Sequence, residues 1–112
     1  MAEIPSRPSL ADLQAYQAAV CRERGWDQTP PLQTFLLFTE EIGELAKAIR
    51  NRLNIYQEKG KQVAPEELQG EFADVLSYLL ELANYFEIDL TEVYRAKEAI
   101  NAARDWGEAA PE

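Results

Sequence analysis

Two pairs of carboxylates border the apolar faces of two expected helices and could bind a metal ion together. Glu41 and Glu44 are separated by one helical step of three residues, as are Glu71 and Asp74, so each pair shares one side of its helix. Successive residues lie about 100° apart around a helix axis. This spacing places Glu41 and Glu71 within the apolar arcs, whereas Glu44 and Asp74 lie at the borders.

Gathering these carboxylates has an energetic cost that a cation would offset. Like charges at this spacing cost about 0.2–0.5 kcal/mol per pair, and the cost grows to the order of several kcal/mol in a partly dry site. Oxygen ligands favour hard divalent cations. Mg²⁺ or Mn²⁺ suits the site better than zinc, because the sequence has no histidine. A solvated helix surface is the alternative, since Glu and Asp are common there.

Capping and stop signals delimit the first and last of the helices that would surround these residues. Residues 10–24 carry an apolar repeat that Ser9 can cap and Gly25 can end. Asp89 can cap a last helix that starts directly after it, and Gly107 offers the stop of that helix.

Two longer helices are expected between them. The first runs from about Leu32 into the fifties with Pro31 in its first turn, and the second is opened by Pro65. We interpret the later part of residues 51–64 as a mobile loop. No segment alternates like a strand, so the sequence predicts an all-α, four-helix bundle-like fold with these two helices as antiparallel neighbours. The expected inward-facing residues are Phe35, Phe38, Ile42, Leu45, Ile49 and Leu53 in the first helix and Leu68, Phe72, Val75, Leu76, Leu79, Leu82 and Phe86 in the second.

Length and composition narrow the class of protein. The 112 residues suit one domain, and the formal charge of −9 repels nucleic-acid phosphates, so we expect no nucleic-acid binding. The absence of histidine excludes Ser-His-Asp triads and ordinary zinc sites. The single cysteine, Cys21, cannot form an internal disulfide, and we interpret it as a small half-buried apolar residue. No stretch approaches the ~18 apolar residues of a membrane span, and we predict a cytoplasmic protein without membrane contact.

The order and spacing of these motifs resemble the MazG-like and dCTP pyrophosphatase group of all-α nucleoside triphosphate pyrophosphohydrolases. The pattern of that group is E-E-x-x-E, a variable spacer and E-x-x-D, which reads here as EEIGE at residues 40–44 and EFAD at residues 71–74. A third element, K-x-x-x-N-x-x-R followed by an aromatic residue, is present near the end. The segment ERGWDQ also resembles the tract that precedes the metal helix in dCTP pyrophosphatases. The resemblance covers about residues 10–106.

The resemblance implies a catalytic metal centre and a reaction. Glu41, Glu44, Glu71 and Asp74 would be the Mg²⁺ ligands and the catalytic residues, with Mn²⁺ as a possible substitute. Glu40 would support a ligand or orient a water, or would simply lie on a solvated helix surface. The reaction implied is hydrolysis of a nucleoside triphosphate at the α–β linkage to a monophosphate and pyrophosphate, in nucleotide pool house-cleaning. One of the four carboxylates could act as the general base.

Four further residues are candidates for substrate binding. Lys97, Asn101 and Arg104 would share one helix face, and two cations with an amide suit a phosphate chain. An exposed helix with local ion pairs is the alternative. Trp26 precedes the metal helix, where its indole could stack on a base, and core packing is the competing interpretation.

Departures from the group and rival functions leave alternatives open. After the terminal arginine, the group usually has tyrosine and proline, whereas this chain has Asp105-Trp106-Gly107, so the base preference stays open. The related phosphoribosyl-ATP pyrophosphohydrolase shares the acidic helices. A non-catalytic helical interaction module would need none of the acidic pairs, and should not gain thermal stability with Mg²⁺.

We treat residues 1–112 as a single MazG-like domain, with residues 1–8 and 108–112 expected to be frayed. A small helical unit with half-open acidic clefts is expected to pair with copies of itself, as a homodimer or homotetramer.

Overall fold

A computed structural model describes residues 1–56 and 65–107. The described part contains four α-helices, a short 3₁₀ helix and no strand, which confirms the predicted all-α class. The later part of the predicted mobile loop, residues 57–64, and the predicted frayed tail, residues 108–112, lie outside the described residues. Residues 1–8 have no regular secondary structure.

The first helix, α1 (Leu10–Glu23), is delimited as the sequence predicts. The Ser9 hydroxyl accepts a hydrogen bond from the Asp12 backbone N–H at 3.0 Å, and the Asp12 carboxylate accepts one from the Ser9 N–H at 2.9 Å. This reciprocal pair satisfies donors that the first turn would otherwise leave free. At the other end Gly25 has φ 73°, a left-handed conformation that favours glycine and turns the chain into the 3₁₀ helix η1 (Trp26–Gln28).

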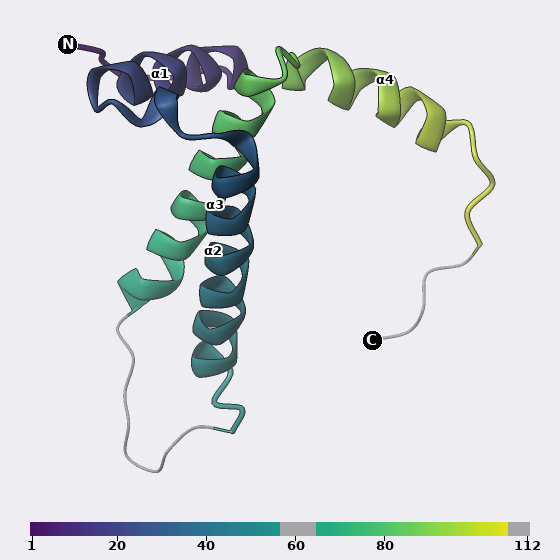
Figure 1. Cartoon of the computed structure of the whole chain (residues 1–112). Coiled ribbons are helices and arrows are strands. Elements are labelled where there is room, and N and C mark those ends of the chain that lie inside the picture. The colour runs from purple at the N-terminus through teal and green to yellow at the C-terminus, as the bar shows by residue number, and fades with distance from the viewer. Residues whose placement is uncertain (57–64, 108–112) are drawn as a thin grey trace.

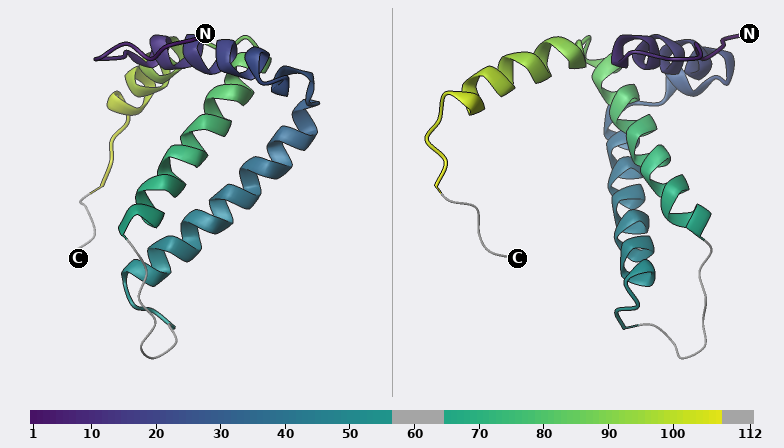
Figure 2. Two further views of the ribbon diagram at one scale, coloured as in Figure 1. Left: turned by 90° about the vertical axis from the view of Figure 1, so that its left-hand side faces the viewer. Right: turned by 180° about the vertical axis from the view of Figure 1, so that it is seen from behind.

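The two long helices are α2 (Pro31–Arg52) and α3 (Pro65–Tyr85), and both begin at a proline as predicted. They lie side by side and run in opposite directions, which confirms the predicted antiparallel pair (Figures 1 and 2). Helix α1 crosses the end of this pair where α2 begins and α3 ends (Figure 1).

The last helix, α4 (Leu90–Ala102), is shorter than the sequence predicts. The Asp89 carboxylate caps it by accepting hydrogen bonds from two backbone N–H groups of its first turn. It ends before the predicted stop at Gly107. The carbonyl oxygen of Asn101 accepts from the Arg104 N–H at 3.2 Å and from the indole N–H of Trp106 at 2.6 Å. The helix ends at Ala102, and these two donors satisfy a carbonyl oxygen that the helix end would otherwise leave free.

A partly buried hydrogen-bond network joins α1 to the end of α3 and the start of α4. The Gln14 amide nitrogen donates to Asn84 Oδ1 at 3.1 Å and to the Ile88 carbonyl oxygen at 2.9 Å. The Gln14 amide oxygen accepts from the Leu90 N–H at 2.9 Å, and the Asn84 amide donates back to the Gln14 carbonyl at 2.8 Å. This network fixes the place from which α4 departs.

The four helices do not close into a bundle within the described part of one chain. The predicted bundle-like packing is therefore wrong for the single chain. Helix α4 leaves the α2–α3 pair on the side away from α1 and extends outward (Figure 1). The buried apolar residues are few and mostly small: Val20, Cys21, Ala48, Leu80 and Ala83. Cys21 is therefore buried, rather than half-buried as the sequence predicts.

Many residues that the sequence places in the core are exposed instead. The reason is that, among the described helices, α1 alone covers the long pair, and it covers one end of it. The residues expected to face inward but exposed in the chain are Phe35, Ile42, Ile49 and Leu53 of α2 and its C-cap, and Phe72, Leu76, Leu79 and Phe86 of α3 and the residue after it. None of the described helices is both long enough and apolar enough to cross a membrane.

Candidate active site

Three carboxylates from the two long helices meet at one place. One oxygen each of Glu41 on α2 and of Glu71 and Asp74 on α3 lie within 4.8 Å of one another. Glu41 and Glu71 are half-buried and Asp74 is exposed. The antiparallel pairing of α2 and α3 brings these residues together across about thirty positions of sequence.

The cluster is electrostatically unfavourable in the protein alone. Partial burial raises the pKa of Glu41 above its ordinary value, and the neighbouring carboxyl of Glu71 and the negative charges of Asp74 and Glu40 raise it further. One oxygen of Glu71, Oε2, is buried and receives no hydrogen bond from the described residues. An orphaned carboxylate oxygen among like charges is costly unless a cation or a donor arrives.

The donor set fits a hard divalent cation. It consists of carboxylate oxygens alone, which Mg²⁺ and Mn²⁺ prefer, and the orphaned Glu71 oxygen is available for such a bond. The fourth predicted ligand, Glu44, is exposed on α2 and does not belong to the close group. Glu40 is also exposed and contributes through its charge on Glu41. The metal roles of all five residues stay predictions.

A cavity of about 360 Å³ adjoins the carboxylate cluster. Its volume lies in the range typical of sites for small molecules. It extends from Glu41 and Asp74 to the aromatic ring of Trp26, so a single ligand could touch both. The residues that line it are Gln17, Arg24, Trp26, Thr29, Thr34, Leu37, Glu41, Asp74, Ser77, Tyr78 and Glu81.

A second cavity, of about 220 Å³, lies between α1, η1, α3 and the start of α2. It shares Gln17, Trp26, Thr29, Thr34 and Glu81 with the first, so the two cavities adjoin. Its remaining lining residues are Ala18, Cys21, Arg22, Asp27, Pro31, Asn84 and Tyr85. The hollow that results extends from the carboxylates to the α1 end of the helix pair.

Trp26 lines both cavities, and its predicted role in base stacking stays a prediction. It is 47% exposed, which argues against simple core packing. The Arg24 guanidinium lies over the ring, with its central carbon 4.9 Å from the ring centroid. One face of the indole is thus engaged by a cation, in an arrangement typical of aromatic–arginine pairs.

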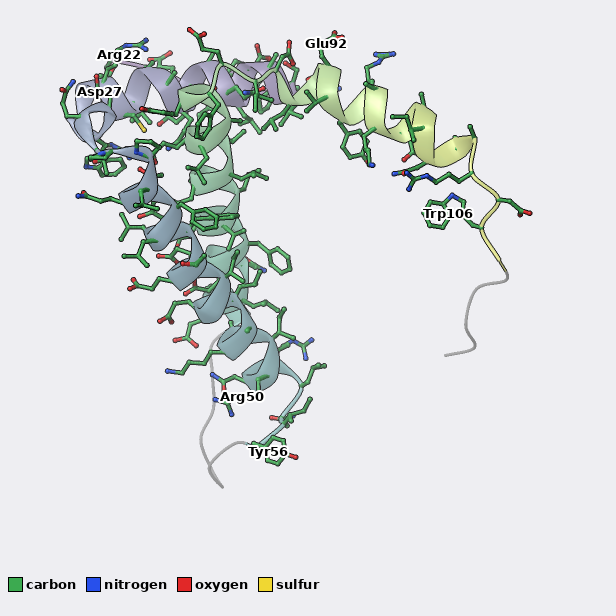
Figure 3. The ribbon with its side chains drawn as sticks, turned by 45° about the vertical axis from the view of Figure 1, so that its right-hand side comes forward. Arg22, Asp27, Arg50, Tyr56, Glu92 and Trp106 are labelled. Carbon is green, nitrogen blue, oxygen red and sulfur yellow. The ribbon has the colours of Figure 1, made fainter. Side chains whose placement is uncertain are left out.

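The predicted phosphate-binding residues lie elsewhere in the single chain. Lys97 and Asn101 are on α4, and Arg104 follows the end of this helix, so the three do not share one continuous helix face as predicted. Helix α4 extends away from the carboxylate cluster, and Trp106 lies beside its far end (Figure 3). The structure therefore unites the carboxylates and Trp26 but not the residues of α4.

Several cavity residues were not singled out by their sequence. Gln17 and Thr34 are buried polar residues, and Glu81 is a half-buried carboxylate. A signal existed for Glu81, because it lies seven positions after Asp74, which is about two helical turns along the same face. Arg24 lies two positions before Trp26, but nothing in the sequence shows that its guanidinium folds over the ring.

Comparison with known proteins supplies a family. The model of the MazG nucleotide pyrophosphohydrolase domain matches residues 29–101. This range contains the carboxylates of α2 and α3 as well as Lys97 and Asn101, whereas Trp26 and Arg104 lie outside it.

Individual relatives agree with the family model. Bovine (Bos taurus) dCTP pyrophosphatase 1 is 34% identical over 104 residues, which cover 88% of this chain and 60% of that protein. The dATP/dGTP diphosphohydrolase of cyanophage S-2L is 39% identical over 101 residues, which cover 90% and 81%. The crystal structure of YpjD from Bacillus subtilis matches 90% of this chain and all of that chain, with a TM-score of 0.74 and 29% identity. The chain spans only about three fifths of the length of the dCTP pyrophosphatases it matches.

Proposed function

Because this chain belongs to the MazG nucleotide pyrophosphohydrolase domain family, we propose that it hydrolyses a nucleoside or deoxynucleoside triphosphate between the α- and β-phosphates in a Mg²⁺-dependent reaction. The products are a nucleoside monophosphate and pyrophosphate. The names of two relatives, dCTP pyrophosphatase and dATP/dGTP diphosphohydrolase, support a nucleotide substrate. A role in removing unwanted nucleotides from the pool, and a cytoplasmic location, belong to the same proposal.

One observation carries this proposal: the carboxylate cluster and the exposed indole of Trp26 line the same cavity. A nucleotide has a planar base at one end and a phosphate chain at the other. The base can stack near Trp26 while the phosphates approach Glu41 and Asp74 through a shared cation. Carboxylates alone would repel a triphosphate, so the cation is a necessary part of the proposal.

The residues of the cluster have distinct roles in this proposal. Glu41, Glu71 and Asp74 hold Mg²⁺, with Glu44 joining from the next turn of α2. When bound, Mg²⁺ draws charge from the phosphate oxygens and lowers the pKa of a water molecule. A carboxylate of the cluster accepts the proton of the attacking water.

We further propose that the chain assembles as a homodimer or homotetramer. The exposed apolar side chains of α2 and α3 favour association, because covering them removes a large apolar area from water. Lys97 and Asn101 on α4 and Arg104 just after it keep their proposed phosphate role. Helix α4 projects outward from the helix pair (Figure 1).

A product assay tests the function. The full chain is incubated with Mg²⁺ and a panel of canonical and modified NTPs and dNTPs, and with phosphoribosyl-ATP, and the products are separated by chromatography. We expect monophosphate and pyrophosphate from at least one triphosphate. We expect Glu41→Gln and Asp74→Asn to lower kcat by about 10²-fold or more, because the site loses a metal ligand or proton acceptor.

Glu67→Gln is the matched control, since Glu67 is an exposed glutamate of α3 outside the cluster. It should retain the activity of the parent chain. Diphosphate and free phosphate as products would mean that a different bond is cleaved. Turnover of phosphoribosyl-ATP alone would assign the enzyme to the related branch. No turnover of any compound, together with no rise in Tm with Mg²⁺, would favour a non-catalytic interaction module.

A further inference from the structure

Glu81 is a half-buried carboxylate that the proposed reaction does not use. It lies on α3 and lines both cavities. None of the described residues donates a hydrogen bond to its carboxylate or forms an ion pair with it. Burial raises the pKa of Glu81. Arg22 and Arg24 also line these cavities, but neither forms an ion pair with Glu81 in the described structure. A carboxylate in this setting gains from a ligand that brings hydrogen-bond donors.

Two polar side chains near Glu81 already make hydrogen bonds within the chain. Both polar atoms of the Asn84 side chain are engaged with Gln14. On α1, the Gln17 amide nitrogen donates to the Cys21 sulfur at 3.5 Å. The charge of Glu81 raises the pKa of the Cys21 thiol, second to burial, which locates the carboxylate close to this part of α1. The carboxylate of Glu81 is therefore a hydrogen-bond acceptor in the part of the hollow nearest α1.

The larger cavity connects this acceptor to the carboxylate cluster. Glu81 and Trp26 line it together with Glu41 and Asp74. A nucleotide whose phosphates approach Glu41 and Asp74 therefore directs its base towards Trp26 and Glu81. The indole offers a flat surface for the ring, and the carboxylate offers two oxygens to the edge of the base.

The chemistry of the bases selects one partner for an ionised carboxylate. Guanine has two adjacent donors on its Watson–Crick edge, the ring N1–H and the exocyclic 2-amino group, which match two carboxylate oxygens. Adenine and cytosine present one donor beside a ring acceptor, and thymine and uracil present one donor between two acceptors. These acceptors would face a negative oxygen and weaken binding, whereas paired donors give charge-assisted hydrogen bonds.

We propose that Glu81 determines base specificity by accepting two hydrogen bonds from the guanine edge, so that the preferred substrate class is guanine nucleotides. The inference rests on the proposed function, because that function supplies the nucleotide substrate. The expected contacts between Glu81 and the base follow from the cavity and do not depend on hydrolysis. A site built to receive two donors discriminates against a base that lacks one of them, because a buried acceptor is then left unpaired.

Comparison of dGTP with dITP tests the inference, because hypoxanthine keeps the N1–H and lacks the 2-amino group. We expect the parent chain to have a kcat/KM for dGTP about ten- to a hundredfold above that for dITP, dATP or dCTP. Glu81→Gln keeps the size of the side chain but removes its charge and one acceptor. The dGTP to dITP ratio should fall to about 1–3 in this variant, with pyrophosphate still released from both. Glu67→Gln should keep the parent ratio.

Binding of dGMP and dIMP to the same three proteins, measured by calorimetry, separates the two claims. If the parent chain hydrolyses no triphosphate, the proposed function fails, and tighter binding of dGMP that is lost in Glu81→Gln still supports the role of Glu81. An unchanged dGTP to dITP ratio in Glu81→Gln overturns the inference while leaving the hydrolase intact. A parent preference for dCTP or dATP over dGTP, or equal binding of dGMP and dIMP, also overturns it.

Discussion

Glu71 is the residue of the candidate site whose surroundings are least favourable for a carboxylate. Its Oε2 atom is buried without a hydrogen-bond partner among the described residues, and an oxygen each of Glu41 and Asp74 lies within 4.8 Å of an oxygen of Glu71. An ordinary solvated glutamate has no reason to occupy such a position. Cation binding explains both the orphaned oxygen and the gathering of like charges, whereas surface solubility explains neither.

Glu81 yields a pH prediction at the same scale. Burial raises its pKa in the folded protein above its ordinary value of 4.5, so the folded state binds this proton more tightly than the unfolded state does. Protonation of Glu81 therefore stabilises the folded protein. This contribution is complete below about pH 4.5 and is lost as the pH rises through the higher pKa of the folded state. Thermal melts from pH 4 to 7.5 without metal should therefore show Glu81→Gln more stable than the parent at neutral pH.

The difference in Tm between Glu81→Gln and the parent should shrink as pH falls, because both side chains are then neutral. Glu67→Gln should show no such convergence. A gap that stays constant over the whole pH range would contradict the assigned effect of burial.

At the scale of elements, the end of α3 is the junction that positions the site. Gln14 of α1 makes hydrogen bonds to the side chain of Asn84, to the Ile88 carbonyl and to the Leu90 N–H. The same helix carries Gln17 and Cys21 into the wall of the cavities. The network thus holds α1 over the α2–α3 pair and shapes the hollow beside Trp26.

Removal of the Gln14 side chain should loosen this junction. Gln14→Ala leaves buried donors and acceptors of Asn84, Ile88 and Leu90 unpaired, so we expect a loss of about 2 kcal/mol in the free energy of unfolding. This corresponds to a fall in Tm of about 10 °C. Gln33→Ala, at an exposed position of α2, is the control and should change Tm by only a degree or two. Equal melting of the two variants would show that the network contributes no stability.

The elements also show which features a sequence can predict. Ser9, Pro31 and Pro65 act within one helical turn, so the starts of α1, α2 and α3 follow from local signals. At the end of α4, the Trp106 indole folds back onto the Asn101 carbonyl, which no local pattern reveals.

The candidate site also contains some features that the sequence predicts and others that it does not. Helical periodicity identifies Glu41 and Glu71 as carboxylates within apolar arcs, and the structure brings them together with Asp74. The sequence places Glu81 on the same helix face as Asp74, but it does not show that Glu81 is half-buried, because this burial depends on how α1 lies across α3. The sequence also does not predict that α4 points away from the α2–α3 pair. The apolar residues of α4 indicate that it packs against something, but they do not specify the partner.

The whole molecule is open for a chain of this size. Its Cα radius of gyration is 17.5 Å, against about 13 Å for a compact domain of this length. Its accessible surface is 9091 Å², against about 6,200 Å² for a compact protein of 12.7 kDa. Much of the excess lies on large apolar side chains such as Leu36, which is 70% exposed, and Phe72, which is 56% exposed. Such a surface is typical of a subunit.

Light scattering coupled to gel filtration should give a mass of two or four chains. Phe72→Glu introduces a charge into the exposed apolar face, so we expect it to shift the protein towards the monomer and to lower its Tm. Ile4→Glu is the control, because Ile4 is an exposed apolar residue of the irregular N-terminal segment. A monomeric parent chain, or an unchanged oligomer in the Phe72→Glu variant, would contradict self-association through this face.

The most direct test of the catalytic centre is a titration with Mn²⁺, followed by the loss of the electron paramagnetic resonance signal of the free ion. It is performed with and without a nucleoside triphosphate whose α–β bridge is a methylene group and cannot be hydrolysed. The parent chain should bind Mn²⁺ and release it to Mg²⁺. Glu71→Gln should weaken binding by about tenfold or more, whereas Glu67→Gln should not change it. Equal Mn²⁺ binding by all three proteins, or none by the parent chain even with the analogue, would contradict a metal centre built by α2 and α3.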